Sequence, residues 1–105
     1  MVEYKKGYFA RSLAGHDKGR LYVIIEEGER TKAGEYVLLC DGRLKTLDKP
    51  KKKKKKHIQV IHTADEQIEN LIRNGQPIKN EDIKRAIKTY NGKHNEMFYV
   101  KYSCK

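Results

Sequence analysis

Two stretches of this chain have the pattern of β-strands that are apolar on both faces, and this limits the folds open to it. The stronger is Leu21-Tyr22-Val23-Ile24-Ile25-Glu26, which is rich in β-branched and aromatic residues. Tyr36-Val37-Leu38-Leu39-Cys40 is the second. Because side chains alternate along a strand, each stretch needs a core on one side and a covering layer on the other. We expect Tyr22 and Ile24 to face the covering layer.

The first 62 residues contain five short strand-like segments separated by turns. The expected strands cover residues 7–12, 21–26, 35–40, 43–47 and 57–61. Asp41-Gly42 is a strong hairpin signal, and the polar segment 27–34 has a glycine near each end. This arrangement predicts a small antiparallel β-barrel, with Ile58 and Val60 on the face that closes its core.

The hydrophobic period becomes helical after residue 62. Thr63-Ala64-Asp65-Glu66 has the form of a capping box, and apolar residues follow at helical spacing until Gly75. Asn80 can cap a second helix, which we expect to end at Gly92. Both helices are too short to be stable alone, so they should pack on the barrel as its cover. The predicted fold is thus mainly β, a barrel of residues 1–62 followed by a helical extension of residues 63–105; residues 96–102 are compatible with an edge strand or a tail.

Basic charge is concentrated in the first part of the chain. The formal net charge is +10, and residues 1–63 carry 16 basic and 8 acidic side chains, against 8 and 6 in residues 64–105. Seven lysines lie between positions 49 and 56, and no acidic residue follows until Asp65. We expect residues 49–56 to form a mobile, self-repelling loop that binds a polyanion. A solvated linker that aids solubility and a nuclear-localisation-like signal are the alternatives.

The sequence offers little for catalysis, metal binding or membrane insertion. It has no dinucleotide or phosphate-loop glycine motif, and its acidic residues are scattered or lie at helix starts. His57 and His62 would point to opposite faces of a strand and could not share a metal. No apolar run approaches the ~20 residues that span a bilayer, and the N-terminal segment lacks a signal-peptide core. With Cys40 in an apolar run, as for a reduced buried thiol, we expect a cytoplasmic protein without enzymatic activity, cofactor or metal.

A basic turn connects the first two expected strands. In Gly15-His16-Asp17-Lys18-Gly19-Arg20, two glycines flank three polar residues and two cations follow closely. Glycine permits positive φ, and such a turn can present backbone N–H groups and cations to a phosphate. A plain turn is the alternative.

This stretch resembles a KOW motif, a strand-turn-strand element of several ribosomal proteins and certain transcription elongation factors. Gly15, Asp17, Lys18, Gly19 and Arg20 match the Gly-x-Asp-Lys-Gly-Lys/Arg turn of the motif. The order of motif, Asp-Gly-Arg, lysine run and two helices is similar to a bacterial family of short KOW-domain RNA-binding proteins, over about residues 5–90. The resemblance implies an SH3-like barrel, as in certain large-subunit ribosomal proteins, that binds RNA.

The charge pattern and the resemblance together predict an RNA-binding protein whose cations contact phosphates. The expected contacts come from the turn, the following hairpin and the lysine run, namely Lys18, Arg20, Arg43, Lys45, Lys49, Lys51, Lys52, Lys53, Lys54, Lys55 and Lys56. We expect ribosomal RNA or the ribosome as partner, and a monomer. The main alternative is a protein-interaction module that docks on the transcription or translation machinery. Binding to an anionic membrane is disfavoured because the lysine run has no apolar anchor beside it.

Overall fold

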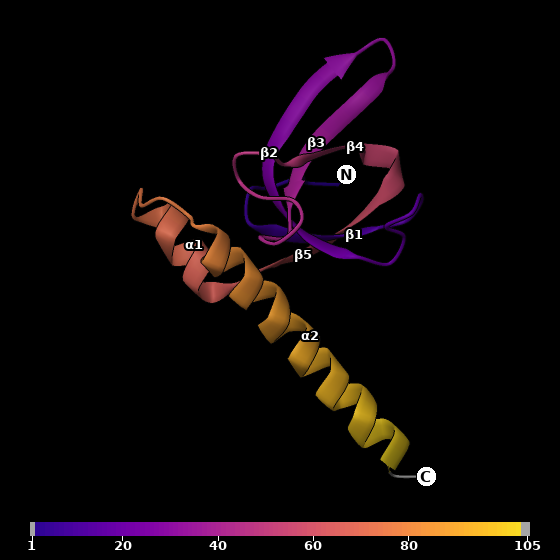
Figure 1. The fold of residues 1–105 in the computed structure, drawn as a ribbon, viewed down its shortest axis with the longest axis vertical. Coiled ribbons are helices and arrows are strands. Elements are labelled where there is room, and N and C mark those ends of the chain that lie inside the picture. Colours follow the sequence, from indigo (N-terminus) through magenta and orange to yellow (C-terminus); the bar gives the residue numbers. More distant parts are fainter. Residues whose placement is uncertain (1, 104–105) are drawn as a thin grey trace.

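One antiparallel sheet of five strands is followed in the chain by two α-helices (Figure 1). The computed structural model describes the backbone of residues 2–103 and the side chains of residues 2–93. The strands are β1 (Tyr8–Ser12), β2 (Leu21–Thr31), β3 (Gly34–Cys40), β4 (Lys51–Lys54) and β5 (Ile58–Ala64), in the sheet order β4-β3-β2-β1-β5. The helices are a one-turn 3₁₀ helix, η1 (Lys55–His57), and α1 (Glu66–Arg73) and α2 (Asn80–Ser103). The predicted fold class, a small antiparallel barrel-like sheet with C-terminal helices, is confirmed.

The sheet curls because its two edge strands, β4 and β5, are consecutive in the chain. The short η1 connects them, and the N–H of Leu13 donates to the carbonyl of His57 (2.8 Å), which ties the start of β5 to the end of β1. Two register shifts along the β2–β3 pair, near Ile24 and near Glu27, add local bends.

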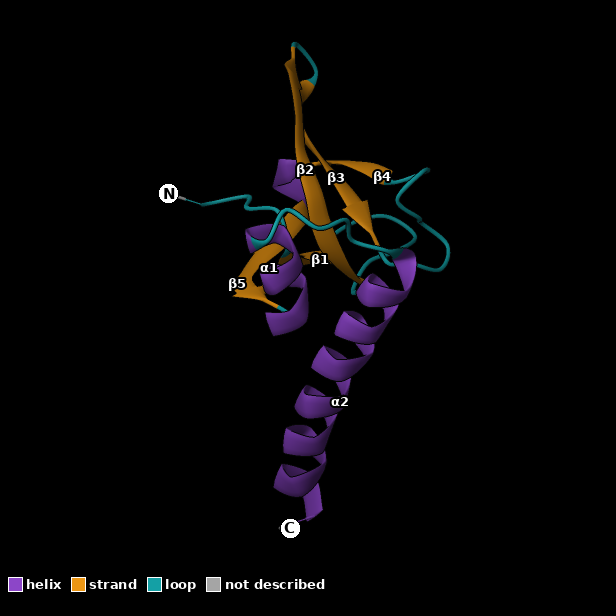
Figure 2. Cartoon of the chain, turned by 90° about the vertical axis from the view of Figure 1, so that its left-hand side faces the viewer, coloured by secondary structure: helices purple, strands orange, loops and turns teal. Residues whose placement is uncertain are grey.

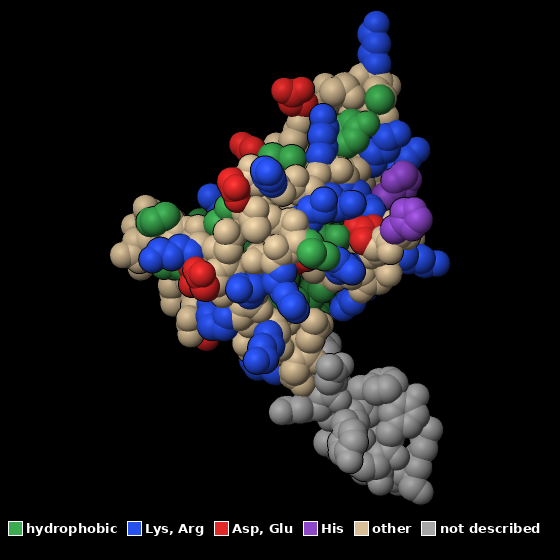
Figure 3. All heavy atoms as spheres, viewed as in Figure 1, with side chains coloured by type: hydrophobic (Ala, Val, Ile, Leu, Met, Phe, Trp, Pro, Cys, Tyr) green, Lys and Arg blue, Asp and Glu red, His purple; other side chains and the backbone are tan. Residues whose placement is uncertain are grey.

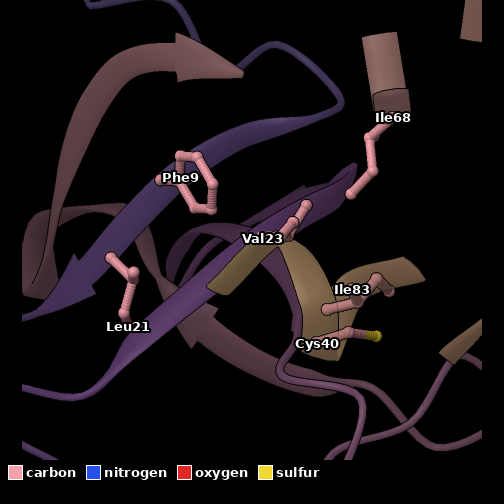
Figure 4. Packing of buried hydrophobic residues seen from close by; sticks show 7 residues of the cluster. Phe9, Leu21, Val23, Cys40, Ile68 and Ile83 are labelled. Carbon is pink, nitrogen blue, oxygen red and sulfur yellow. The ribbon is translucent and has the colours of Figure 1, made fainter. Parts of the chain in front are cut away.

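Apolar side chains fill both faces of the sheet, as predicted. The inner face, turned away from the helices, buries Ala10, Tyr22, Ile24, Val37, Leu39 and Ile58, with Val60 packed against them. The outer face buries Phe9, Leu21, Val23 and Cys40 against Ile68 of α1 and Ile83 and Ala86 of α2 (Figure 4). The expectation that Tyr22 and Ile24 lie under the helices was therefore wrong. The helices cover Leu21 and Val23, while the Tyr22 hydroxyl reaches a carboxylate on the other side of the sheet.

Both helices differ from the prediction at one end. Thr63, the predicted cap of α1, still belongs to β5, and Asp65 is the N-cap, its carboxylate accepting the N–H of Ile68 (3.1 Å). The second helix does not end at Gly92 but continues to Ser103, so residues 96–102 are helical in backbone (Figure 2). A glycine inside a helix costs only about 1 kcal/mol, and no proline follows it in this chain.

The lysine run is the largest departure from the prediction. The expected loop 49–56 is instead largely β4 and η1, and β4 pairs with β3 in the register Leu39↔Lys51 and Val37↔Lys53. Lys51 and Lys53 therefore share the inner face with Leu39 and Val37, where their apolar stems can lie against the core. The predicted strand 43–47 is an irregular turn, closed by an isolated bridge between Thr46 and Lys49.

Candidate nucleic-acid interface

The KOW-like turn, residues 15–20, lies between β1 and β2 and is held in a fixed conformation. Gly15 and Gly19 each have φ of +89°, a value that side chains with a Cβ disfavour. The N–H of Gly19 donates to the carbonyl of Ser12 (2.8 Å), and the guanidinium of Arg11 donates to the carbonyl of Gly19 (2.8 Å). Lys18 and Arg20 are exposed on this turn.

Asp17 joins the turn to the lysine strand. Its carboxylate accepts hydrogen bonds from Lys53 Nζ (2.7 Å), the Tyr22 hydroxyl (2.7 Å) and Ser12 Oγ (2.9 Å), and Lys51 Nζ lies 3.6 Å away. Burial alone would raise the pKa of Asp17, but the hydrogen bonds from Lys53 and Tyr22 outweigh it and hold the pKa well below its usual range. Burial and the same carboxylate raise the pKa of Tyr22. The cluster therefore contains a charged carboxylate and a neutral phenol at neutral pH.

The six consecutive lysines form two sets. Lys51, Lys53 and Lys55, the acid-paired lysines, each have a carboxylate partner: Asp17 for the first two, and Glu27 and Glu35 (3.4 Å) for Lys55. Lys52, Lys54 and Lys56, the acid-free lysines, have no carboxylate within 4.0 Å among the described residues, and Lys52 Nζ lies 4.7 Å from the ring centroid of Tyr36. The expectation of a self-repelling loop was wrong, because the fold brings in acids from β2, β3 and the turn. Three of the six lysines therefore form ion pairs within the protein.

A broad open groove with a cationic lining runs between the sheet and α2. Five cations line it, namely Arg11, Arg20, Arg43, Lys84 and Lys88, together with one acid, Asp41. They come from β1, the KOW-like turn, the turn 41–45 and α2. In Figure 3, Lys and Arg side chains gather beside the described part of α2 and again over β4. The positive potentials of the five cations add in the groove, and the sum strengthens its attraction for an anion.

The turn 41–45 that forms one rim of the groove is held against α2. Gly42 has φ of +78°, and a Cβ added there would lie 2.5 Å from the carbonyl oxygen of Asn80. The Asn80 side-chain oxygen accepts the N–H of Leu47 (2.9 Å), so it fastens the segment that follows this turn; Asn80 is itself the first residue of α2 and not the helix cap that the sequence suggested. The two sides of the groove are thus connected by close backbone packing and a hydrogen bond.

The structure brings only some of the predicted site residues together. Arg20 and Arg43 line the groove, Lys18 is exposed on the neighbouring turn, and the remaining predicted residues lie outside the groove. Lys45 is half-buried in the turn 41–45, and Lys49 is exposed further along the chain.

Sequence reasoning missed three groove cations. Lys84 and Lys88 are four residues apart, so they lie on the same side of the helix, and this spacing could have identified them as a pair. The sequence did not show that this side of the helix borders a groove with the sheet. Arg11 lies in the expected strand 7–12, where the sequence alone does not single it out.

Residues 2–93 contain no group of three or more His, Cys, Asp or Glu side chains placed to hold a metal ion, and no described helix is long and apolar enough to cross a membrane. Burial raises the pKa of the Cys40 thiol to about 11, so it is protonated at neutral pH. No protein-family model matches the sequence, and no curated protein is significantly similar to it.

Proposed function

We propose that this protein is a non-enzymatic RNA-binding protein of the KOW type that binds ribosomal RNA in the cytoplasm. The observation that carries the proposal is the groove in which five cations from four elements surround a single acid. That acid is already engaged: Asp41 Oδ1 accepts the N–H groups of Arg43 (2.9 Å) and Lys45 (2.8 Å). The groove therefore favours a ligand with several closely spaced negative charges, and a nucleic-acid backbone has them.

RNA is a better match than duplex DNA for this groove. Reading of DNA by a helix requires that the helix project into the major groove. The described start of α2 instead packs on the sheet through Ile83 and Ala86, and its two lysines face a groove shared with arginines of the sheet side. A composite basic groove of this kind suits folded RNA, which is recognised by shape and by its backbone. The acid-free lysines add attraction from a second surface.

Fluorescence anisotropy with a labelled structured RNA tests the proposal. The double variant Arg20→Ala/Arg43→Ala should lose about tenfold or more in affinity, since each lost charge-assisted phosphate contact contributes about 1 kcal/mol. Five cations on phosphates also predict that log K falls with log salt with a slope of about −4. The matched control is Arg30→Ala/Arg73→Ala, which removes the same charge from two exposed arginines outside the groove.

Three results would contradict the proposal in different ways. Equal losses in the groove and control variants would mean that net charge alone attracts RNA. An affinity that does not change with salt would exclude phosphate contacts. A protein partner retained from cells with no crosslinked RNA would favour the interaction-module alternative, whereas crosslinking and sequencing should recover ribosomal RNA.

A further inference from the structure

The cationic groove also has an apolar part that phosphate binding does not explain. Leu44, at the tip of the turn 41–45, is 71% exposed, more than Val2 (52%) or Leu13 (46%), and it lines the groove together with Ile87 of α2. Single exposed leucines are common on protein surfaces. This one differs because it stands among five cations, where a bound polyanion would cover it.

The turn holds Leu44 outward in a defined position. Besides the two N–H groups that Asp41 Oδ1 accepts, the N–H of Asp41 (2.9 Å) and the N–H of Gly42 (3.0 Å) both donate to the carbonyl of Lys45. Gly42 is packed against α2, which restrains the turn next to the leucine. The backbone that carries the side chain is therefore already ordered before binding, which lowers the cost of ordering on binding.

We propose that the groove binds an unpaired nucleotide of the RNA, with its base against Leu44 and Ile87 and its neighbouring phosphates on the surrounding cations. This inference rests on the proposed RNA-binding function and narrows the ligand. A continuous A-form helix offers riboses and phosphates and keeps its base faces stacked, so an apolar side chain gains little from it. A base at a bulge or loop exposes its face, and leucine side chains do pack against unstacked bases. Phosphates on either side of that base would meet Arg43 on one rim and Lys84 or Lys88 on the other.

The test compares two labelled RNA hairpins that differ only in one unpaired nucleotide bulged from the stem. Wild-type protein should bind the bulged hairpin about fivefold or more tightly than the fully paired one. Leu44→Ala should lose that preference and keep its affinity for the paired hairpin. Leu44→Phe should keep or increase the preference, because an aromatic ring stacks better on a base. The matched control is Leu13→Ala, which removes an exposed leucine that does not line the groove.

The outcomes separate this inference from the proposed function. Equal binding of both hairpins by wild type, or an equal loss for both hairpins in Leu44→Ala, would overturn the unpaired-nucleotide site and leave RNA binding intact. Failure of wild type to bind either hairpin would overturn the proposed function itself. Equal affinity for a bulged DNA hairpin would show that the site does not select RNA. If Leu44→Ala lowered the melting temperature, the test would rest on Leu44→Phe. Loss of the preference for the bulged hairpin in that variant would refute the base contact.

Discussion

Replacing Asp17 with asparagine should destabilise the fold by about 3 kcal/mol. The Asp17 side chain is only 11% exposed and that of its partner Lys53 only 10%, so the variant leaves a nearly buried ammonium beside the carbonyl of Ala14 (2.8 Å) but without a carboxylate partner. Breaking a buried ion pair by removing one charge costs about 3–5 kcal/mol. Asparagine still offers one acceptor oxygen, so we expect the lower end of that range. For a small domain with about 5–15 kcal/mol of stability, this loss is large.

Urea denaturation followed by circular dichroism measures this loss, with Asp48→Asn as the control at an exposed carboxylate outside the cluster. The control should change the free energy of unfolding by less than about 0.5 kcal/mol. A double-mutant cycle with Lys53→Met should give a coupling of about 1 kcal/mol or more between the two side chains. If the two asparagine variants were equally stable, the ion pair between Asp17 and Lys53 would not stabilise β4, contrary to the argument from burial.

The same variant predicts a change in the dependence of stability on pH. The pKa of Asp17 is lower in the folded chain than its ordinary value of about 3.9, so the folded state favours the charged form. Its contribution is therefore fully present above that ordinary value and is lost as pH falls toward the folded-state pKa. Below pH 4, within the range where the rest of the chain stays folded, wild-type stability should fall more steeply with decreasing pH than the stability of Asp17→Asn.

Two further predictions concern the lysine run and the helices. Changing the three acid-paired lysines to serine should lower the melting temperature, whereas the same change at the three acid-free lysines should leave it within a few degrees and weaken RNA binding; the reverse pattern would show that the pairing is unimportant. A chain that ends at Thr63 should associate or unfold, because it uncovers Phe9, Leu21 and Val23 at about 2 kcal/mol each, as light scattering and thermal melting would report. A monomer with an unchanged melting temperature would mean that the helices are not a cover.

Most of the fold was predictable because four of the five strands have residue patterns of their own. The segments that became β1, β2, β3 and β5 contain aromatic or β-branched residues and are separated by turns or by the lysine run. The strand β4 could not be predicted, since four identical lysines show no alternation between an apolar and a polar face. Its strand state depends on partners from distant parts of the chain, namely Leu39 for pairing and Asp17 for charge. The face of the sheet that the helices cover could not be predicted either, because both faces of β2 are apolar.

The candidate site was predictable in kind but only partly in composition. Clustered basic charge and the turn at residues 15–20 indicated phosphate binding, and Arg20 and Arg43 are in the groove. The lysine run was predicted to bind phosphates because charges that are adjacent in sequence were expected to be adjacent in space. In the fold, alternation along β4 and the acids nearby divide that run, while Arg11 and Lys88 come together from opposite ends of the chain.

The position of β4 at the edge of the sheet has a consequence for self-association. An edge strand exposes unpaired backbone N–H and C=O groups, to which a strand of another molecule can add. Here all four residues of that edge are lysines, and two such edges brought side by side would place like charges directly across from one another. Charged residues on an edge are a common protection against strand-by-strand aggregation. The lysine strand is therefore expected to keep copies of this protein apart during folding and at high concentration, when no polyanion is bound.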